Sequence, residues 1–451
     1  MASVETQPPV VKLAQFVQDA TRQAHDASRT ELQRILQAHV DETTAHELGR
    51  ARGEPKTTAL DGQRSLWRCS RCGSQRKGDL SYSGHYLRVV DTAQGSVCLQ
   101  IPRVRCRCGG NVSPDFGATL PKRQRQWYDL HLATVELHVE GLSYRGLQRH
   151  FARQGCAVGL GGLSRHLARF SAVDINSTTA GRYADCVTTD AAFVRVAGAC
   201  QAHYYAHEVL LRETPLVRAG RPVAWHRTGK VLACHVAAEE TQEGWSRVFE
   251  QLVTRDMIGF GQRVGFISDG NQGLLAAADL WLPWSVKQRC IWHIAHRARD
   301  KAGADNKDAF ERSALWVFKA SSTAQACTRL KAFVDRWGPR EPEATKSVVR
   351  KFAQGVTHLQ HPEMAILPRT VGLSERYNQE PKRRWRAMRG FGNGACMEAM
   401  MRLIALRHNC IIDRTDWLTY AAQSVWGAPV TAPTARRQER PTPTAYTTTG
   451  T

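Results

Sequence analysis

The segment Val264-Gly-Phe-Ile-Ser-Asp269-Gly270 carries the clearest fold signal in this chain. Its short apolar run predicts a buried strand, and the apolar spacing from Gln272 to Leu282 predicts a helix directly after it. Further β-rich runs lie at 186–189, 204–211 and 231–236, and a further helical run lies at 239–252. This alternation predicts an α/β domain with a mixed sheet flanked by helices.

The regions on either side of this domain differ from it in pattern and charge. Residues 1–61 are polar with helical spacing and hold nine acidic and seven basic side chains, whereas residues 64–125 hold twelve basic and three acidic ones. The basic stretch alternates like strands, with Gln94-Gly95 as a hairpin turn. We therefore predict five parts: a helical region at 1–61, a β-module at 62–120, a second helical region at 121–175, the α/β domain at 180–415 with a helical insertion at about 298–368, and a disordered basic tail at 429–451.

The overall composition restricts the class of protein. The 451 residues carry a formal charge of +21, and 42% of them are hydrophobic. That hydrophobic content excludes a wholly disordered chain, and the charge indicates a polyanionic partner such as nucleic acid. There is no run of 18 apolar residues, so no membrane partner is expected. The N-terminus lacks the pattern of a secretion signal, and 13 cysteines in a chain of this size fit a reducing cytoplasm.

Five cysteines cluster between Cys69 and Cys108. Cys69-Ser-Arg-Cys72-Gly is followed by Cys106-Arg-Cys108-Gly-Gly, and two such turns can supply the four thiolates of a structural Zn²⁺ site. We predict that Cys69, Cys72, Cys106 and Cys108 are the ligands. Because the second pair has one intervening residue, Cys98 or His85 could replace one ligand. Free structural thiols or a redox Cys-x-x-Cys pair are the other interpretations.

Two short helical stretches separated by glycines suggest a helix-turn-helix. The first follows Ser143, a plausible N-cap, and the second runs over 163–169 after the glycines at 159–162. Ser164, Arg165 and Arg169 could face a major groove of DNA. An ordinary helical hairpin with a solvated basic face is the alternative.

Three acidic residues are candidates for a catalytic metal site. Asp190 ends the run Cys186-Val-Thr-Thr-Asp190, Asp269 ends the strand quoted above, and Glu375 lies in Gly372-Leu-Ser-Glu375-Arg-Tyr-Asn378. Each alone could cap a turn or a helix. Together they could bind two Mg²⁺ (or Mn²⁺) ions for phosphoryl transfer, since these ions prefer oxygen ligands.

The segment after Glu375 is strongly basic. Residues 376–389 contain six Lys or Arg side chains and one Glu, with Tyr377 and Trp385 between them. Such a strip could simply be solvated, but beside a metal site it could follow a DNA backbone and stack on an unpaired base. The predicted DNA contacts here are Arg376, Lys382, Arg383, Arg384, Arg386 and Arg389.

With these motifs, the chain from about 120 to 410 resembles the mutator-type DDE transposases of bacterial insertion sequences. Asp190, Asp269-Gly270, Cys290-Ile-Trp-His293 and Glu375 match the order and spacing of that family's motifs. The resemblance implies a ribonuclease H-like catalytic domain, with the first Asp at the end of the first strand and the second Asp after the fourth. It also implies that Cys290 and His293 support the site. The cysteine module resembles that of some insertion-sequence subgroups.

Other acidic, cysteine and histidine residues near these motifs are alternative ligands. Asp185 and Glu380 are the nearest alternative carboxylates, but Asp185 precedes its strand and Glu380 lies near the opposite face of the helix from Glu375. Cys290, His293 and His296 could form a second zinc site that lacks a fourth ligand. His203 and His207 are expected to be ordinary histidines on a strand.

The predicted function is therefore DNA cleavage at the ends of an element followed by strand transfer into target DNA. The partners would be the terminal inverted repeats and target DNA, bound by a homodimer or higher oligomer in the bacterial cytoplasm, associated with the nucleoid. A ribonuclease H-like nuclease or resolvase without strand transfer is one alternative. A non-catalytic, zinc-dependent DNA-binding regulator is the other.

Overall fold

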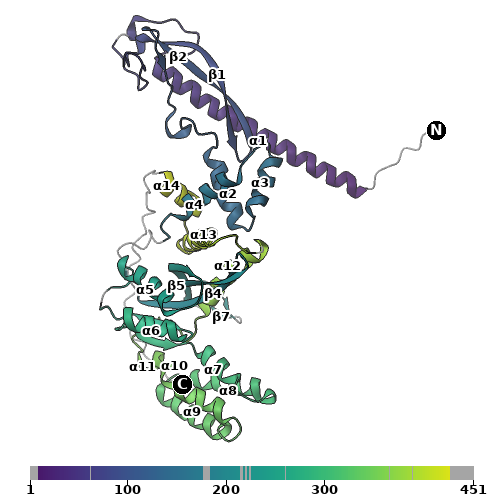
Figure 1. The fold of residues 1–451 in the computed structure, drawn as a ribbon, viewed down its shortest axis with the longest axis vertical. Coiled ribbons are helices and arrows are strands. Elements are labelled where there is room, and N and C mark those ends of the chain that lie inside the picture. The colour runs from purple at the N-terminus through teal and green to yellow at the C-terminus, as the bar shows by residue number, and fades with distance from the viewer. Residues whose placement is uncertain are drawn as a thin grey trace, which may run out of the picture. The chain divides into compact units, whose positions relative to one another are not determined.

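The computed structural model describes residues 9–60, 62–175, 183–213, 217–218, 221–222, 225–259, 261–364, 366–388 and 390–426. The chain, drawn in Figure 1, divides into two compact units. The first comprises Met1–His138 and Leu142–His166, and the second comprises Val139–Gly141 and Leu167–Thr451. No described helix is long and apolar enough to cross a membrane. The tail predicted at 429–451 lies outside the described residues.

The first unit is built on a long helix and a small antiparallel sheet. The helix is α1 (Pro9–Leu48), and the sheet has the order β1 (Leu80–Thr92), β2 (Gly95–Cys106), β3 (Asn111–Val112). Short 3₁₀ turns lie at Thr58–Leu60, Lys77–Asp79 and Gly117–Thr119. The apolar residues that alternate along β2 are buried and pack with Leu36 and Val40 of α1, as expected for a strand with one face in a core.

The predicted hairpin exists, but its turn is shifted by one residue. Thr92 pairs with Gly95, so the two-residue turn is Ala93-Gln94 and not Gln94-Gly95. Gly95 has φ +117°, a value that L side chains rarely adopt, so the glycine is needed at the first residue of β2.

Three helices follow: α2 (Tyr128–Val139), α3 (Tyr144–Arg153) and α4 (Leu160–Ser171). Ser143 caps α3 as predicted, because its hydroxyl accepts a hydrogen bond from Gly146 N at 3.2 Å. The break before the next helix is shorter than predicted, since α4 begins at Leu160 and includes two of the glycines. Leu147, Phe151 and Leu163 form a common core, so these helices pack as one cluster.

The second unit contains a five-stranded mixed sheet in the order β10-β9-β4-β5-β8. The antiparallel part is β4 (Cys186–Val196), β5 (Ala199–Glu213) and β8 (Trp225–Ala237), and β9 (Gly265–Ser268) and β10 (Val286–Arg289) run parallel to β4. A separate pair, β6 (Val217–Arg218) with β7 (Arg221–Pro222), lies between β5 and β8 in the chain. The mixed α/β class is confirmed, and β10 is a strand that the sequence pattern did not indicate.

Alternate residues of the central strands pack against different helices. Tyr204 of β5 belongs to the core that includes α5 (Gln242–Thr254) and α6 (Gln272–Trp281). Its neighbour Tyr205 lies 5.4 Å (ring centroids) from Tyr377 of α12 (Gly372–Met388). Figure 1 shows α5 and α6 on one side of this sheet and α12 and α13 (Gly394–Asp413) on the other. Because successive side chains of a strand point to opposite faces of a sheet, neighbouring residues of β5 contact helices on opposite faces.

The predicted helical insertion forms its own apolar core. After α7 (Ile291–Arg299) the chain forms a 3₁₀ turn (Ala304–Asn306) and then α8 (Lys307–Phe318), α9 (Thr323–Trp337), α10 (Pro342–Gly355) and α11 (Thr357–Gln360). Phe310, Phe318 and Trp337 are buried there together with Ile294 of α7. The insertion is therefore anchored to the helix that follows β10. The last described helix is α14 (Trp417–Trp426).

Candidate functional site

The first candidate carboxylate, Asp190, lies within β4 and not at its end as predicted. The β-forming residues after it continue to pair with β5 as far as Val196 opposite Ala199. The parallel pairing of β4 with β9, however, stops at Thr188 opposite Ile267. Asp190 therefore lies in the middle of the segment that pairs with β5. On the β9 side it lies two residues beyond the last paired residue, just as Asp269 lies two residues beyond Ile267.

The Asp190 carboxylate is held at both oxygens. Oδ1 accepts from the Ala191 backbone N at 2.9 Å, and Oδ2 accepts from Nδ2 of the buried Asn378 at 2.8 Å. The net effect of its surroundings raises the pKa of Asp190 to about 7. Burial is the largest cause, the hydrogen bond from Ala191 opposes the increase, and the charges of Asp269 and Glu375 add to it. Asp269 and Glu375 therefore both lie within electrostatic reach of Asp190.

Asp269 directly follows β9, as predicted, and helix α6 begins three residues later. Its Oδ1 accepts from the backbone N of Asn271 at 3.0 Å, and its Oδ2 accepts from Nη2 of Arg297 on α7. Gly270 has φ +81°, and a Cβ there would collide with the guanidinium of Arg289. The positive φ favours glycine at this position, and a larger residue would also displace the guanidinium of Arg289.

Glu375 lies in the first turn of α12, where a negative charge is favourable. Its side chain is 45% exposed, and its Oε1 lies 3.9 Å from Nε2 of His293. Burial raises its pKa, and the charge of Lys382 partly opposes this increase. The alternative Glu380 instead pairs with Arg383 at 3.1 Å and with Arg384 at 3.6 Å, so it faces other partners than Glu375 does.

The residues of Cys290-x-x-His293-x-x-His296 separate in the structure. Cys290 is buried with Ile267 and Val371, whereas Nδ1 of His296 lies 3.1 Å from Glu311. Within the described residues these three side chains do not form a group of metal ligands, which is against the second zinc site. His203 and His207 are fully buried on β5, and burial lowers the pKa of both, as expected for ordinary core histidines.

Several of the predicted DNA contacts are accessible and others are not. Arg165 and Arg169 are exposed on α4, Arg376, Arg383 and Arg386 are exposed on α12, and Lys382 is partly exposed. Arg384 is an error of prediction: its side chain is only 6% exposed and pairs with Glu140 at 3.1 Å. Tyr377 is also buried, so it is not available for stacking on a base. Arg389 lies outside the described residues.

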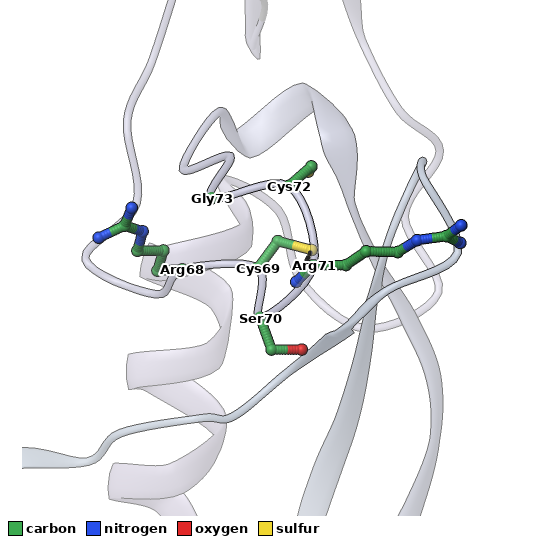
Figure 2. A pocket seen from close by; sticks show the side chains of 6 residues that line it. All are labelled: Arg68, Cys69, Ser70, Arg71, Cys72 and Gly73. Carbon is green, nitrogen blue, oxygen red and sulfur yellow. Dashed lines mark hydrogen bonds between the residues drawn. The ribbon is translucent and has the colours of Figure 1, made fainter.

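The loop of the first cysteine pair is shaped by close backbone contacts. Figure 2 shows residues Arg68–Gly73, with the two arginine side chains directed to opposite sides of the loop. The backbone N of Gly73 donates to the carbonyl of Cys69 at 3.1 Å, and Gly73 has φ +73°. Gly110 approaches from the second pair so closely that a Cβ would lie 2.7 Å from Sγ of Cys69. Gly73 therefore allows the conformation of the first turn, and Gly110 allows the second turn to approach it.

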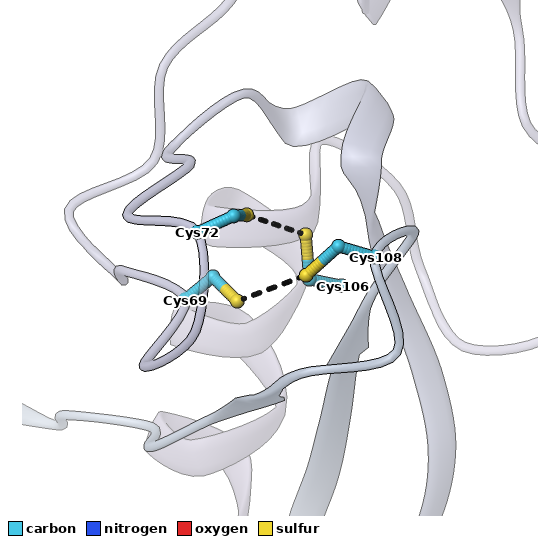
Figure 3. A group of neighbouring side chains, drawn as sticks. All are labelled: Cys69, Cys72, Cys106 and Cys108. Atoms are coloured by element: carbon cyan, nitrogen blue, oxygen red, sulfur yellow. Dashed lines mark hydrogen bonds between the residues drawn. The ribbon is translucent and has the colours of Figure 1, made fainter.

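The four predicted cysteines gather as one group. Their ligand atoms all lie within 4.8 Å of one another, and Sγ–Sγ distances of 3.6 Å join Cys69 to Cys108 and Cys72 to Cys106 (Figure 3). A tetrahedron of sulfurs around Zn²⁺ has edges of about 3.8 Å, because each Zn–S bond is about 2.3 Å, whereas a disulfide bond is about 2.05 Å. The cluster can therefore hold a zinc ion. Cys98 and His85, the alternative ligands, are not in this group.

The protonation of the cysteine group also fits a bound cation. Backbone N–H groups of Cys72 and Arg71 lower the pKa of Cys69 to about 6. At Cys106 a backbone hydrogen bond lowers the pKa, but burial and the neighbouring thiols outweigh it and raise the pKa to about 12. Four thiols at these distances cannot all ionise unless a positive ion balances their charge. Among the described residues, no three of the candidate carboxylates and histidines form a group as close as that of the four cysteine sulfurs.

Two partners of the carboxylates were not predicted as site residues. Asn378 lies one helical turn after Glu375, and Arg297 lies one turn after His293. That spacing was a usable signal, because residues three or four apart share a helix face. Each residue brings a side chain to a different carboxylate, so both contribute to the geometry of the site.

The chain is similar to known transposases over most of its length. The model of the Mutator family of transposases matches residues 7–411, which includes the cysteine-containing segment. A transposase for insertion sequence element IS406 from Burkholderia multivorans is 27% identical over 333 residues, covering 72% of this chain and 80% of that protein. A transposase for insertion sequence element IS1201 from Lactobacillus helveticus is 22% identical over 261 residues, covering 57% of this chain and 65% of that protein.

Proposed function

Because this chain belongs to the Mutator family of transposases, we propose that it cuts DNA at the ends of a mobile element and joins the freed 3′ ends to target DNA. Asp190, Asp269 and Glu375 are the proposed catalytic residues. The observation that carries this assignment is that Asp269 and Glu375, from two distant segments of the chain, both lie close enough to Asp190 for their charges to raise its pKa. Perturbed carboxyl groups of this kind are typical of functional sites.

The strand order supports a ribonuclease H-like catalytic domain. Asp190 lies on the first strand of the sheet along the chain, which is central, and Asp269 follows the fourth, which is parallel to it. The resemblance to mutator-type enzymes assigns the two aspartates to these same strands. The insertion between α7 and α12 then separates the third carboxylate from the second, as in the family.

In this proposal, Asp190, Asp269 and Glu375 hold two Mg²⁺ or Mn²⁺ ions. When bound, such ions activate the attacking oxygen and stabilise the leaving oxygen of a phosphodiester. Asp190 must release its proton before its oxygens can bind a cation, because its pKa is about 7. Asn378 fixes the orientation of this carboxylate, and Arg297 balances the charge of Asp269.

Recognition of DNA is assigned to surfaces of both units. The zinc-binding cysteine module and the exposed Arg165 and Arg169 of α4 would bind the terminal repeats. The exposed Arg376, Arg383 and Arg386 of α12 and the partly exposed Lys382 would contact phosphates near the active site. Bringing two element ends together needs at least two copies of the chain, so the active complex would be a homodimer or larger.

The test is an excision and joining assay that uses the DNA flanking the coding region, with Mg²⁺. Wild type should produce cut ends and joined products. Asp269→Asn should abolish both, whereas Asp279→Asn should leave both intact, because the exposed Asp279 on α6 pairs only with Lys287 among the described ion pairs. Cut products that are never joined would favour a nuclease. Equal activity of the two variants would remove Asp269 from the site.

A further inference from the structure

Five cationic side chains lie on or next to β10, α7 and α10, where α10 contacts both β10 and α7 and one of the cations, Arg297, pairs with Asp269. Arg289 ends β10, Arg297 and Lys301 lie on or just after α7, and Arg350 and Lys351 lie on α10. The guanidinium of Arg289 donates to the carbonyl of Gly270 at 3.1 Å and to Oε1 of Gln354 at 3.2 Å. Because Gln354 is also on α10, these bonds connect the residue after Asp269 to the insertion. We name this group the insertion cations.

The insertion cations have little negative charge to balance them. Among the ion pairs of the described residues, their single carboxylate partner is Asp269, which pairs with Arg297. Burial and the charges of Arg289, Arg297, Lys301 and Arg350 together lower the pKa of Lys351 to about 8. Like charges at such density repel one another, and an anion bound among them would relieve that repulsion.

The chemistry of the group favours a phosphate as the anion. Two members are arginines that are partly buried and fixed by hydrogen bonds, and the planar guanidinium suits pairing with phosphate oxygens. Lys301 and Arg350 are exposed, so a large polyanion can reach them. The group begins at Asp269, where the proposed function locates a phosphodiester.

We propose that the insertion cations form a binding surface for the DNA backbone next to the phosphodiester that reacts. This inference rests on the proposed function and adds a role for the insertion, which would bind DNA directly and not only space the third carboxylate. It provides a phosphate contact surface in addition to the exposed cations of α12.

The experiment measures equilibrium binding of a labelled DNA duplex, made from the DNA flanking the coding region, at several salt concentrations without added Mg²⁺. The double variant Arg350→Ala with Lys351→Ala removes two of the proposed contacts. It should bind more weakly, and the slope of log K against log salt should become less steep by about 2, since each phosphate contact contributes about 0.9. Lys351→Arg should keep the wild-type slope.

The matched control is Arg340→Ala with Lys346→Ala, which removes two exposed charges from α10 and the turn before it. Its slope should equal that of wild type. Suppose that wild type binds the duplex and that the two double variants have the same slope, either equal to that of wild type or reduced. The insertion cations are then not the contact surface, but the proposed function is unaffected. If wild type does not bind DNA at any salt concentration, both are overturned.

Discussion

The cysteine cluster, which can hold a metal ion, and the proposed carboxylate site are assembled in opposite ways. The cysteines come from two turns within 40 residues of sequence, and their sulfurs lie within 4.8 Å of one another. The carboxylates come from β4, from the loop after β9 and from α12. Asn378 holds Asp190 and Arg297 holds Asp269.

The cysteine cluster would be a closed metal site, whereas the proposed carboxylate site would be an open one. Four sulfurs can fill every position around a tetrahedral zinc ion, so that site can stabilise a small module but offers no place for a substrate. Carboxylates that are farther apart leave coordination positions for water and for a phosphodiester. We therefore expect changes in the first region to act on folding and DNA recognition, and changes in the second to act on chemistry.

The largest expected effect is that of Asp190→Asn. The loss of one cation-binding charge should lower strand transfer by at least about 1,000-fold, which corresponds to several kcal/mol of lost stabilisation of the transition state. DNA binding and the melting temperature should change little. Normal strand transfer by this variant would show that the buried carboxylate is not part of the chemistry, and the contrast between the two regions would then fail.

The opposite result is expected for Cys106→Ser. Zinc content should fall from about one ion per chain to near zero, because binding supplies much of the folding free energy of such small modules. Binding to the element ends should weaken by roughly 100-fold. The exposed Cys98 lies in the same module outside the cluster, so Cys98→Ser should keep its zinc. Retention of zinc by Cys106→Ser, measured by elemental analysis, would contradict the cluster.

A smaller effect should come from Asn378→Ala, which removes the donor to Oδ2 of Asp190. Loss of a partner of a metal ligand typically costs about 10- to 100-fold in activity or metal affinity. The Mg²⁺ concentration for half-maximal strand transfer should rise by that order, while DNA binding stays constant. Gln379→Ala changes the exposed neighbouring residue and should have no effect. A fall in melting temperature with unchanged Mg²⁺ dependence would assign Asn378 a packing role only.

The smallest effect concerns pH. Since the pKa of Asp190 is raised to about 7, protons compete with Mg²⁺ below that value. The half-maximal Mg²⁺ concentration should rise by up to about tenfold for each pH unit below 7 and level off above it. DNA binding measured over the same pH range serves as the control. A profile that is flat between pH values of about 5.5 and 7.5 would show that Asp190 is already ionised when the metal binds.

The same contrast explains how much the sequence could predict. Cys69, Cys72, Cys106 and Cys108 could be identified from spacing alone, because each pair lies within one turn. Val97, Leu99 and Ile101 alternate, and the strand and its buried face follow from that pattern. The turn of the hairpin was wrong by one residue, since pairing register depends on both strands.

The carboxylate site was harder to predict, because its geometry depends on tertiary structure. β4 extends beyond Asp190 because the β-forming residues after it pair with β5, and the local sequence does not show where the pairing with a partner strand ends. Arg384 looks like any other residue of a basic strip, yet Glu140, far away in sequence, pairs with it and buries it. Asn378 could be seen in the sequence motif, but its hydrogen bond to Asp190 of β4 could not be predicted from it.

The most direct test of the account compares two glutamates of α12 in the joining assay with Mg²⁺. Glu375→Gln and Glu380→Gln remove the same charge from one helix, but only Glu375 lies beside His293 and acts on the pKa of Asp190. If Glu375 belongs to the catalytic site, Glu375→Gln should abolish joining while binding DNA normally, and Glu380→Gln should join DNA at close to the wild-type rate. Full activity of Glu375→Gln, with or without loss of activity in Glu380→Gln, would contradict that assignment.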